Sequence, residues 1–413
     1  MTAITTGTDD VAPRRSFREV WVVCTGHALT HWYPATFYLL LPLIGRELGL
    51  NYSQIGAIIA FQYAAGAIAN IPGGIFVDSV GRKGILMALS LFWIGFPYLV
   101  MGYVHSYWMI LSCAVLIGIG NNLWHPTAIP WLANRFPERK GLVMAFHGMG
   151  GNFGDAVAPL AIGFLLQTYN WREVVVMNVV PGILMSAAIL FYLGRIYSAE
   201  KAAGKGEAAE SRLKGKALLS SFRTLLKSKA LVMISGSSAF RALTQSALMT
   251  ILPLYLANDM GYSVFWVGVC MFAVQAAGFA AAPIAGHLSD RMGRRQIILT
   301  SMGMTAVVLL AMIAAGGSDF FVLLIALLGF FLFSIRAVLQ AWLLDATPRN
   351  MGGSAIGIMF GTQAVGQAIG PYAAGVLADT YGIMSAFYFL AATIVIANLF
   401  VFFTPMGKAE AKG

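Results

Sequence analysis

The chain is a succession of long apolar runs separated by short polar breaks. Each run reaches about 20 residues, the length that a helix needs to cross the ~30 Å hydrocarbon core of a bilayer. No strand-like alternation of apolar and polar positions competes with this pattern. We therefore predict an all-α membrane protein with twelve transmembrane helices, at residues 18–45, 53–77, 84–104, 107–134, 141–168, 172–195, 230–257, 264–289, 296–315, 319–346, 353–379 and 382–404.

One long polar break, residues 196–229, divides these helices into six and six. It is rich in Lys, Ala, Gly and Glu, and we interpret it as a linker on the cytoplasmic side of the membrane. The sequence thus predicts two six-helix bundles, at residues 18–195 and 230–404. The polar ends, residues 1–17 and 405–413, are expected to be cytoplasmic tails because neither contains an apolar signal core.

A charged tight turn occurs twice in the chain. Residues 74–83 and 286–295, which are 212 positions apart, both read Gly-x-x-x-Asp-x-x-Gly-Arg-(Lys/Arg). Ala158-Pro159 and Gly370-Pro371 match at the same separation. A shared offset at several places indicates that the two bundles are copies of one unit, related by pseudo-two-fold symmetry. Internal repeats of this kind are common in secondary transporters.

The composition and the placement of charge agree with a membrane protein. Hydrophobic residues make up 58% of the chain and charged residues 11%, whereas soluble domains carry about 25% charged residues. Apart from Arg46, Arg172, Arg241 and Arg336, every Lys and Arg falls on a segment at the membrane face that carries both chain ends. Positive charge marks the cytoplasmic face. The net charge of +10 therefore predicts cytoplasmic termini and contacts with membrane lipid, and gives no indication of nucleic-acid binding.

Together, the six-plus-six helices, the long central loop and the repeated charged turn resemble the major facilitator superfamily. Within it, Gly26-His27, His125-Pro126 and the run Gly150-Gly151-Asn152 resemble the fosmidomycin-resistance branch. The chain departs from that branch at Thr30-His31, where the branch tends to have Asn-Asp. The resemblance implies that helices 1, 4, 7 and 10 surround a central cavity. It also implies that the charged turns act as a cytoplasmic gate that breaks as the bundles rock.

The residues expected in this gate lie at the cytoplasmic ends of helices. Aspartates in the turn can sit near a helix N-terminus or pair with the arginines, while glycines permit the tight turn. A positive-inside anchor with no gating role explains the same residues. The gate residues are Gly74, Asp78, Gly81, Arg82, Asp290, Arg294, Asp345 and Arg135.

Two arginines lie inside predicted spans, where a charged side chain is costly unless it lines a cavity or finds a partner. Arg241 and Arg336 fall near the membrane midplane, and the resemblance brings them to the central cavity. The planar guanidinium group suits carboxylate or phosphate oxygens. We hypothesise that the two arginines clamp an anionic substrate. The alternative is that they pair with a buried acid such as Asp155 or with helix carbonyl groups.

Histidines occupy the same depth in the first half. His27 and His31 are one helical turn apart, so their side chains share a face. Histidine titrates near neutral pH, which suits proton coupling, and Asp155 is a competing proton carrier. Each histidine could instead be a hydrogen-bonded packing residue.

Further polar and aromatic residues lie beside these positions and could contact a substrate. Amides and aromatic rings inside helices also serve structural hydrogen bonding and packing, and that interpretation stays open for each of them. The candidate substrate-binding residues, besides the two arginines, are His125, Asn121, Asn122, Gln245, Trp32, Tyr38 and Trp124.

Metal, cofactor and enzyme chemistry find little support in the sequence. His27, His31, His125 and His147 could supply nitrogen ligands, but no spacing demands a metal and the arginines would repel a divalent cation, so we expect none. No phosphate-binding loop or nucleophile turn is present in the sequence, which argues against ATP-driven transport and against an enzyme. We expect no cofactor; a proton gradient would supply the energy.

These features predict a proton-coupled secondary transporter of a small organic anion that works by alternating access, with export of a drug or phosphonate as one form of this activity. A proton symporter importing a carboxylate or phosphate ester is the alternative. A lipid or amphiphile translocase, or a non-transporting receptor, is the alternative from another class. We expect a monomeric, multi-pass protein of the cell (inner) membrane.

Overall fold

The computed structural model describes residues 16–80, 82–202, 225–316, 318, 320–348 and 351–405. Gly81, most of the predicted linker and most of both tails therefore lie outside the described residues. For some helical residues, among them Gly74, Asp78 and Asn122, the structure describes the backbone alone. All regular structure in the described ranges is helical, as predicted.

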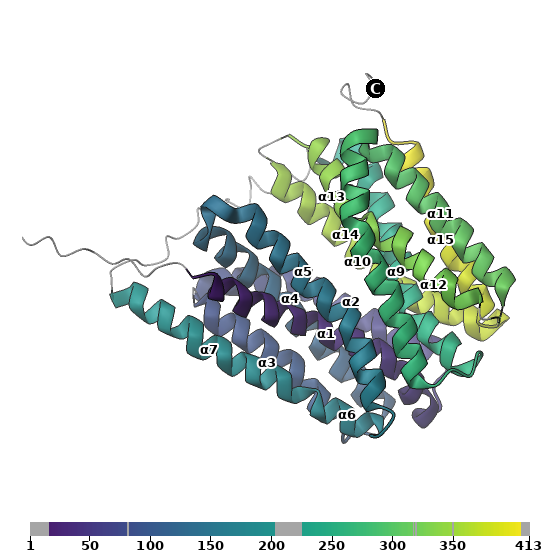
Figure 1. Cartoon of the computed structure of the whole chain (residues 1–413), viewed down its shortest axis with the longest axis horizontal. Helices are drawn as coiled ribbons and strands as arrows, with labels where there is room; N and C mark the ends of the chain where they lie inside the picture. The colour runs from purple at the N-terminus through teal and green to yellow at the C-terminus, as the bar shows by residue number, and fades with distance from the viewer. Residues whose placement is uncertain are drawn as a thin grey trace, which may run out of the picture.

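The first half forms one bundle and the second half another (Figure 1). The helices of the first are α1 (Phe17–Leu48), α2 (Tyr52–Val80), α3 (Lys83–Met101), α4 (Tyr107–Arg135), α5 (Lys140–Leu165), α6 (Trp171–Met177) and α7 (Val179–Ala202), with a short 3₁₀ turn, η1 (Pro137–Arg139). Those of the second are α9 (Lys229–Asn258), α10 (Val264–Met292), α11 (Arg294–Ala315), α12 (Phe320–Ser334), α13 (Arg336–Asp345), α14 (Gly352–Tyr381) and α15 (Met384–Phe402).

The twelve predicted helices are confirmed, with two of them broken. The sixth consists of α6 and α7, which meet at Asn178, and the tenth consists of α12 and α13, which meet at Ile335. Helix α7 continues to Ala202, seven residues beyond the predicted span. The duplication is visible in the backbone as well. Gly49 and Gly261, 212 residues apart, both have the positive φ that favours glycine, at 62° and 68°.

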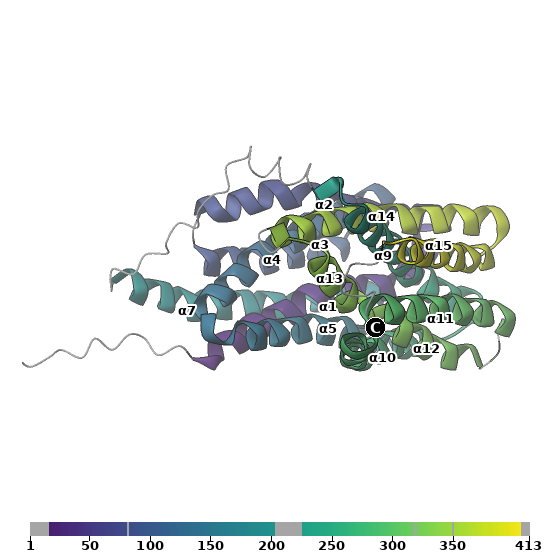
Figure 2. The same ribbon diagram turned by 90° about the horizontal axis from the view of Figure 1, so that it is seen from above.

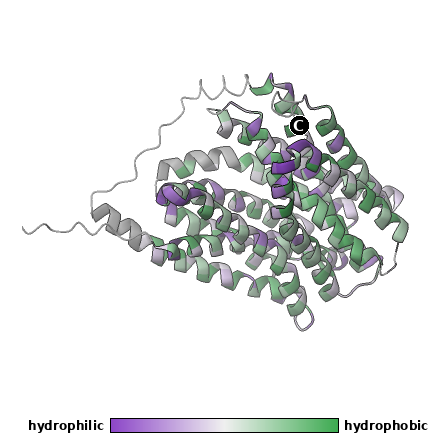
Figure 3. Ribbon diagram, turned by 45° about the horizontal axis from the view of Figure 1, so that its top comes forward, coloured by the Kyte–Doolittle hydropathy of each residue, from purple (hydrophilic) through white to green (hydrophobic). Residues whose placement is uncertain are grey.

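Seven spans in the described ranges are long and apolar enough to cross a membrane on composition alone: α3, α4, α6 with α7, α10, α11, α12 with α13, and α15. Green hydrophobic residues run along the helices of both bundles (Figure 3). Helices α1, α2, α5, α9 and α14 are not among these seven spans, and part of α2 lies outside the described side chains. These five pack against one another across the middle of the molecule, in the pairs α1–α5, α2–α14 and α9–α14. Helices α1, α5, α9 and α14 are therefore less apolar than the seven spans, and they lie at the centre of the molecule.

The two halves touch at the end of the molecule away from the chain termini. Arg46 donates hydrogen bonds to the Asn258 side chain at 2.9 Å and to the Ala257 carbonyl at 2.5 Å. The Asp379 carboxylate accepts hydrogen bonds from the backbone N–H groups of Tyr52 and Ser53, both at 2.8 Å, and so caps the first turn of α2. We call these side chains and the α2–α14 crossing beside them the outer contact. Figure 2 shows α2 and α14 side by side.

The outer contact is close because glycines face carbonyl groups across it. A Cβ on Gly56 would lie 2.3 Å from the Pro371 carbonyl oxygen, and one on Gly375 would lie 2.4 Å from the Tyr52 oxygen. Both distances are well below van der Waals contact. Burial beside this crossing raises the pKa of the Asp259 carboxyl, and a hydrogen bond from the Tyr52 hydroxyl opposes that rise. The bundles are thus held together at one end, and their ribbons diverge toward the other (Figure 1).

A buried ion pair fastens the opposite end of the first bundle. Glu19, in the first turn of α1 and 2% exposed, binds Arg135 at the end of α4, with the Nε–Oε2 distance at 2.7 Å. The Glu19 carboxylate also accepts from the backbone of Ser16 and closes a capping box. Arg135 is one of the residues expected in the gate with Asp345; in this conformation it binds Glu19 of its own bundle.

Glu19→Gln is expected to lower the free energy of unfolding by about 1–2 kcal/mol, because the neutral amide removes the charge that Glu19 presents to Arg135 in a buried position. The change should appear as a lower melting temperature of the purified protein in detergent. The control is Glu138→Gln at an exposed position of η1, which should leave the melting temperature unchanged. Equal melting temperatures for the two variants would show that the pair contributes nothing.

Candidate functional site

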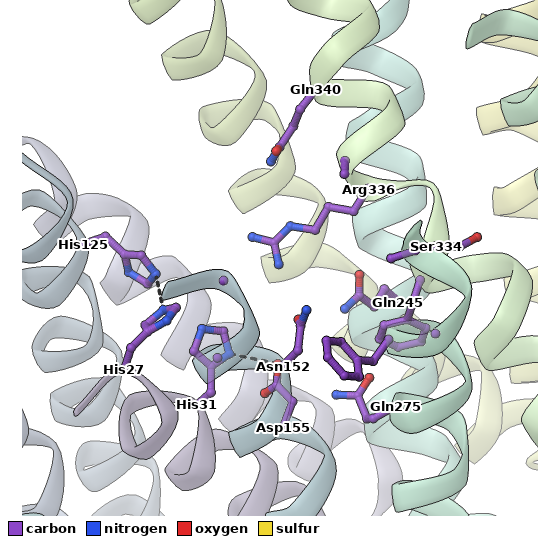
Figure 4. Close-up of a pocket in the computed structure, with 17 residues that line it drawn as sticks. His27, His31, His125, Asn152, Asp155, Gln245, Gln275, Ser334, Arg336 and Gln340 are labelled. Carbon is purple, nitrogen blue, oxygen red and sulfur yellow. Dashed lines mark hydrogen bonds and ion pairs between the residues drawn. The ribbon is translucent and has the colours of Figure 1, made fainter. Parts of the chain in front are cut away.

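A cavity of about 280 Å³ lies between the two bundles, near the middle of the central helices. Its walls come from α1, α4 and α5 on one side and from α9, α10, α12 and α13 on the other (Figure 4). The lining residues are His27, His31, His125, Gly148, Gly151, Asn152, Asp155, Gln245, Gln275, Gly278, Phe279, Ala282, Phe333, Ser334, Arg336, Ala337 and Gln340.

Histidines form the wall contributed by the first bundle. The Nδ1 of His27 is 2.6 Å from the backbone carbonyl oxygen of His147, and its Nε2 is 3.1 Å from the Nε2 of His125. The His147 ring stacks on His27, with ring centroids 3.7 Å apart and an interplanar angle of 13°. A carbonyl oxygen only accepts hydrogen bonds, so the proton of His27 resides on Nδ1. His27 is therefore held in one orientation with Nε2 facing His125.

His31 lies one turn further along α1 and binds Asp155 of α5, with 2.9 Å between Nδ1 and Oδ2. Both side chains are about one quarter exposed, at 23% and 27%, so the pair meets the cavity. From the sequence, Asp155 is a possible partner for the arginines. In this structure it binds His31 instead.

Glycines of α5 bring these groups together. A Cβ on Gly154 would lie 2.0 Å from the Ala28 carbonyl oxygen, and one on Gly150 would lie 2.5 Å from the Cys24 oxygen. A Cβ on Gly151 would meet His27 Cε1 at 2.8 Å and His31 Nε2 at 3.0 Å. The small residues thus let α1 and α5 approach closely enough for His31 to reach Asp155.

The second bundle contributes a cation and several amides to the facing wall. Arg336 is the first residue of α13, directly after the break at Ile335, and its side chain extends into the cavity toward the histidines (Figure 4). It forms no ion pair with any side chain in the described ranges. Gln245, Gln275 and Gln340 lie on the same wall. The described residues of this wall therefore offer one guanidinium group without an ion-pair partner, beside neutral amides.

Arg241 occupies a different position from the one expected. It is 2% exposed, does not line the cavity, and donates from Nη1 to the Oε1 of Gln245 at 2.7 Å. Its Nε is buried and has no hydrogen-bond partner among the described residues. The two residues are four apart on α9, so the amide stands between the guanidinium group and the cavity. Arg241 orients Gln245, and the structure does not bring the two arginines together as direct lining groups.

Trp32, Tyr38, Trp124 and Asn121 lie outside the cavity wall. Trp32 donates from Nε1 to Asn178 at 2.7 Å, and Tyr38 shares a hydrogen bond with Tyr63 at 2.8 Å. Trp124 is fully buried and lies parallel to His27, with 6.5 Å between ring centroids. The Oδ1 of Asn121 is buried without a partner in the described part of the chain, and the Asn122 side chain lies outside the description.

Several lining residues were not singled out as site residues from the sequence. These are Asn152, Gln275, Gln340, Ser334, Phe279 and Phe333. For the three amides among them, Asn152, Gln275 and Gln340, the signal is an amide within an apolar run on a helix that packs at the centre. That signal is shared by Gln363, which binds Ser238 inside the second bundle instead. Amide content alone therefore does not separate cavity residues from packing residues.

The gate candidates of the second bundle bind one another. Arg294 pairs with Asp290 four residues earlier at 2.5 Å and, from Nε, with Asp345 of α13 at 3.3 Å. It also donates to Ser289 Oγ at 2.7 Å. The carboxylates of Asp290 and Asp345 are each 62% exposed. In this conformation these residues tie α10 to α13 within one bundle. In the first copy, Arg82 is exposed, Gly81 is undescribed, and Gly74 and Asp78 are described by backbone only.

Comparisons with known proteins agree with this architecture. The family model described as Major Facilitator Superfamily matches residues 23–279 and 234–413. The chain is 24% identical to the fosmidomycin resistance protein of Escherichia coli over 397 residues, covering 95% of this chain and 94% of that protein. It is 22% identical to a phosphoglycerate transporter protein of Salmonella typhimurium, covering 91% of this chain and 85% of that protein.

Among solved structures, a bacterial homolog of the human lysosomal transporter Spinster, in an inward-facing and unoccupied conformation, superimposes with a TM-score of 0.78. It is 16% identical in sequence, and the match covers 95% of this chain and 97% of that one. The helix order, the two bundles and the family match lead to one conclusion. The chain belongs to the Major Facilitator Superfamily and is a multi-pass membrane transporter of the secondary type, not an enzyme.

Proposed function

We propose that this protein moves a small organic anion across the inner membrane in exchange for, or together with, protons. The observation that carries the proposal is the opposition of two walls across one cavity. Arg336, without an ion-pair partner among the described residues, lies on one side, and the His31–Asp155 pair lies on the other. One wall offers a binding group for an anion, and the other offers groups that gain and lose protons.

The anion-binding half of the argument rests on charge. A guanidinium group inside a membrane protein is costly unless an anion or a hydrogen-bonding cavity compensates it. Arg336 is compensated by no described acid, so a carboxylate or phosphoryl oxygen of the cargo would complete its hydrogen bonds. Gln245, held by Arg241, adds an oriented amide. A volume of about 280 Å³ suits a small metabolite or drug fragment.

The proton-coupling half rests on the His31–Asp155 pair. With the pair ionised, the imidazolium and carboxylate attract each other and hold α1 against α5. Protonating Asp155 or deprotonating His31 weakens that attraction, so the proton count at the pair is linked to the packing of two central helices. Binding an anion beside the pair favours the more protonated form. Anion and proton occupancy are thereby coupled through one electrostatic field.

Alternating access would use the two ends of the molecule. The outer contact closes one end in this conformation, and the charged residues around Arg294 would close the other when the bundles rock. The distribution of Lys and Arg supports cytoplasmic termini, and the outer contact would then face the outside of the cell. The structure would represent an inward-facing state, like the Spinster homolog that it resembles.

The relatives favour two cargo classes of the same charge. One is named for fosmidomycin resistance and another for phosphoglycerate transport. Export of a drug or phosphonate is the leading form of the proposal. Uptake of a carboxylate or phosphate ester is the second form, because the same free arginine serves both.

The test uses purified protein in proteoliposomes with fosmidomycin and 3-phosphoglycerate as probes. An imposed pH gradient should drive uphill movement of at least one anion, and a protonophore should abolish it. The direction of the gradient that works distinguishes exchange from co-transport. Movement that is unaffected by the protonophore, or that is seen with neutral and cationic solutes alone, would contradict the proposal.

Asp155→Asn is expected to remove the stimulation by a pH gradient while retaining counterflow of anion between the two sides of the vesicle. The amide keeps a hydrogen bond to His31 but cannot exchange a proton at this position. Counterflow with and without the gradient is the measurement, and Glu138→Gln is the control that keeps gradient stimulation. If Asp155→Asn is still driven by the gradient, the coupling proton is carried elsewhere.

A further inference from the structure

We propose that His27, His31 and His125 form a binding site for a divalent transition-metal ion of the zinc class. One ring nitrogen from each residue lies within 4.8 Å of those of the other two. Sequence spacing gave no reason to expect this cluster. His27 and His31 lie on α1, and His125 lies on α4, 98 and 94 positions further along the chain. The fold makes the cluster, and nothing in the proposed transport of anions requires it.

The hydrogen bonds of the cluster leave nitrogen lone pairs facing inward. The His147 carbonyl accepts from His27 Nδ1, and the Asp155 carboxylate accepts from His31 Nδ1. In a neutral ring, these hydrogen bonds place the proton on Nδ1, so each ring keeps an acceptor lone pair on Nε2. Histidine ligands of metals almost always donate their other ring N–H to a carbonyl or carboxylate in this way. Two of the three candidate ligands therefore already have the outer hydrogen bond that a metal site uses.

The separation of His27 and His125 suits a small tetrahedral ion. Zinc binds imidazole nitrogen at about 2.0–2.1 Å, which separates two ligand nitrogens by about 3.3 Å at the tetrahedral angle. The Nε2 atoms of His27 and His125 are 3.1 Å apart. His31 Nε2 packs against Gly151 beside the His27 ring, where a Cβ at residue 151 would intrude. Glycine at residue 151 therefore leaves the edge of His31 that carries Nε2 uncovered by a side chain at that position.

The fourth coordination position would face the cavity. All three histidines line it, as does Arg336 on the opposite wall (Figure 4). Three protein ligands with an open position are typical of zinc sites that bind a further molecule. Arg336 opposes a bare dication electrostatically and favours one accompanied by an anion, and Asp155 offsets part of the charge. A carboxylate or phosphoryl oxygen is therefore the preferred fourth ligand.

A proton shared between His27 and His125 is the competing explanation for their short separation. With His27 protonated on Nδ1, the hydrogen between the two Nε2 atoms must come from His125 or from an added proton. A metal ion and that proton would use the same lone pairs. If that hydrogen is an added proton, metal binding should release it and should weaken as the pH falls. If it belongs to neutral His125, it moves to Nδ1 of that ring and no proton is released.

The experiment uses the full chain without a histidine tag, stripped with chelator and titrated with Zn²⁺ by isothermal calorimetry. We expect one Zn²⁺ per chain, no comparable heat with Mg²⁺, and X-ray absorption of the complex reporting three imidazole nitrogens near 2.0 Å. His125→Gln should lower the affinity by about 100-fold or more. The chain has six histidines, and His105→Gln and His287→Gln are matched controls outside the cluster that should bind as the parent does.

The assignment would be overturned if the protein does not bind Zn²⁺, or if His105→Gln or His287→Gln abolishes binding. An absorption spectrum dominated by oxygen ligands would also overturn it. The spectrum of the unmutated protein decides even if His125→Gln fails to fold. Asp155→Asn, which alters the partner of His31 and removes no ligand, should weaken Zn²⁺ by about 10-fold. Anion transport is measured separately, so failure here leaves the proposed function untouched, and the reverse holds as well.

Discussion

Arg336→Ala should lower the affinity of the protein for its anionic ligand by about 100-fold, which corresponds to the loss of two charge-assisted hydrogen bonds of about 1.5 kcal/mol each. The guanidinium group extends into the cavity and forms no ion pair with a described residue, so its removal leaves no acid stranded in the protein. The unliganded fold should consequently tolerate the change, and the loss should be confined to binding.

The measurement is the rise in melting temperature on adding fosmidomycin or 3-phosphoglycerate, since ligand that binds the folded state raises apparent stability with concentration. Arg336→Lys keeps the charge but not the planar fork, and should fall between the parent and Arg336→Ala. Arg18→Ala, an exposed cation at the start of α1, is the control for a general loss of positive charge. Undiminished affinity in Arg336→Ala would mean that the anion is recognised elsewhere.

Gln245→Ala offers a comparison on the same wall. It removes the amide that accepts a hydrogen bond from Arg241. Without that amide, nothing on residue 245 stands between the guanidinium group of Arg241 and the cavity. If Arg241 then reaches the anion, affinity in Gln245→Ala falls less than in Arg336→Ala. The two variants therefore separate the arginine that contacts the cavity from the arginine that stands behind it.

The architecture could be predicted from sequence because its signals are local and repeated. Twenty-residue apolar runs specify helices by length, and a charged turn recurring after 212 residues specifies two similar bundles. The breaks at Asn178 and Ile335 were not predicted. Pro181 has no N–H to bond to the Met177 carbonyl four residues earlier, so the break at Asn178 has a local signal that could have predicted it. No proline or glycine stands at the break at Ile335, and that break has no comparable signal in the local sequence.

Several residues of the site could be predicted from the sequence, but which of them bind one another could not. His27 and His31 share a face of one helix by spacing alone. That His31 binds Asp155 depends on how α1 slides along α5, which is fixed by backbone contacts at Gly150 and Gly154. Trp32 follows His31 immediately, so it points about 100° away around the helix and leaves the cavity. The i, i+4 relation of Arg241 and Gln245 was present in the sequence and could have predicted that the amide screens the arginine.

Gly375→Ala should shift the protein away from the outer-closed conformation by up to about 3 kcal/mol, or about 100-fold in the ratio of the two conformations. The added methyl group would lie 2.4 Å from the Tyr52 carbonyl oxygen, and a backbone atom cannot rotate aside as a side chain can. Helices α2 and α14 must therefore separate. Separation also removes the hydrogen bonds that Asp379 accepts from Tyr52 and Ser53 at the same crossing.

Distances between spin labels at the outer ends of the two bundles measure this shift. Tyr103 after α3 and Tyr381 at the end of α14 are 70% and 75% exposed, so a cysteine at each position can carry a label. The native Cys24, Cys113 and Cys270 are buried and should label poorly. The distance distribution should move to longer values in Gly375→Ala. Gly357→Ala, on the same helix with no atom within 4 Å of the added group, should reproduce the parent distribution.

The same substitution tests whether the outer contact is a gate or a fixed fastening. If it is a gate, Gly375→Ala and Gly56→Ala change the distances in the same direction, because they obstruct one crossing from its two sides. Their combined effect should then be less than additive, since a crossing already opened by the first methyl group presents no clash to the second. Lower melting temperatures with unchanged distances in both variants would instead identify the crossing as structural, and transport would have to open the molecule elsewhere.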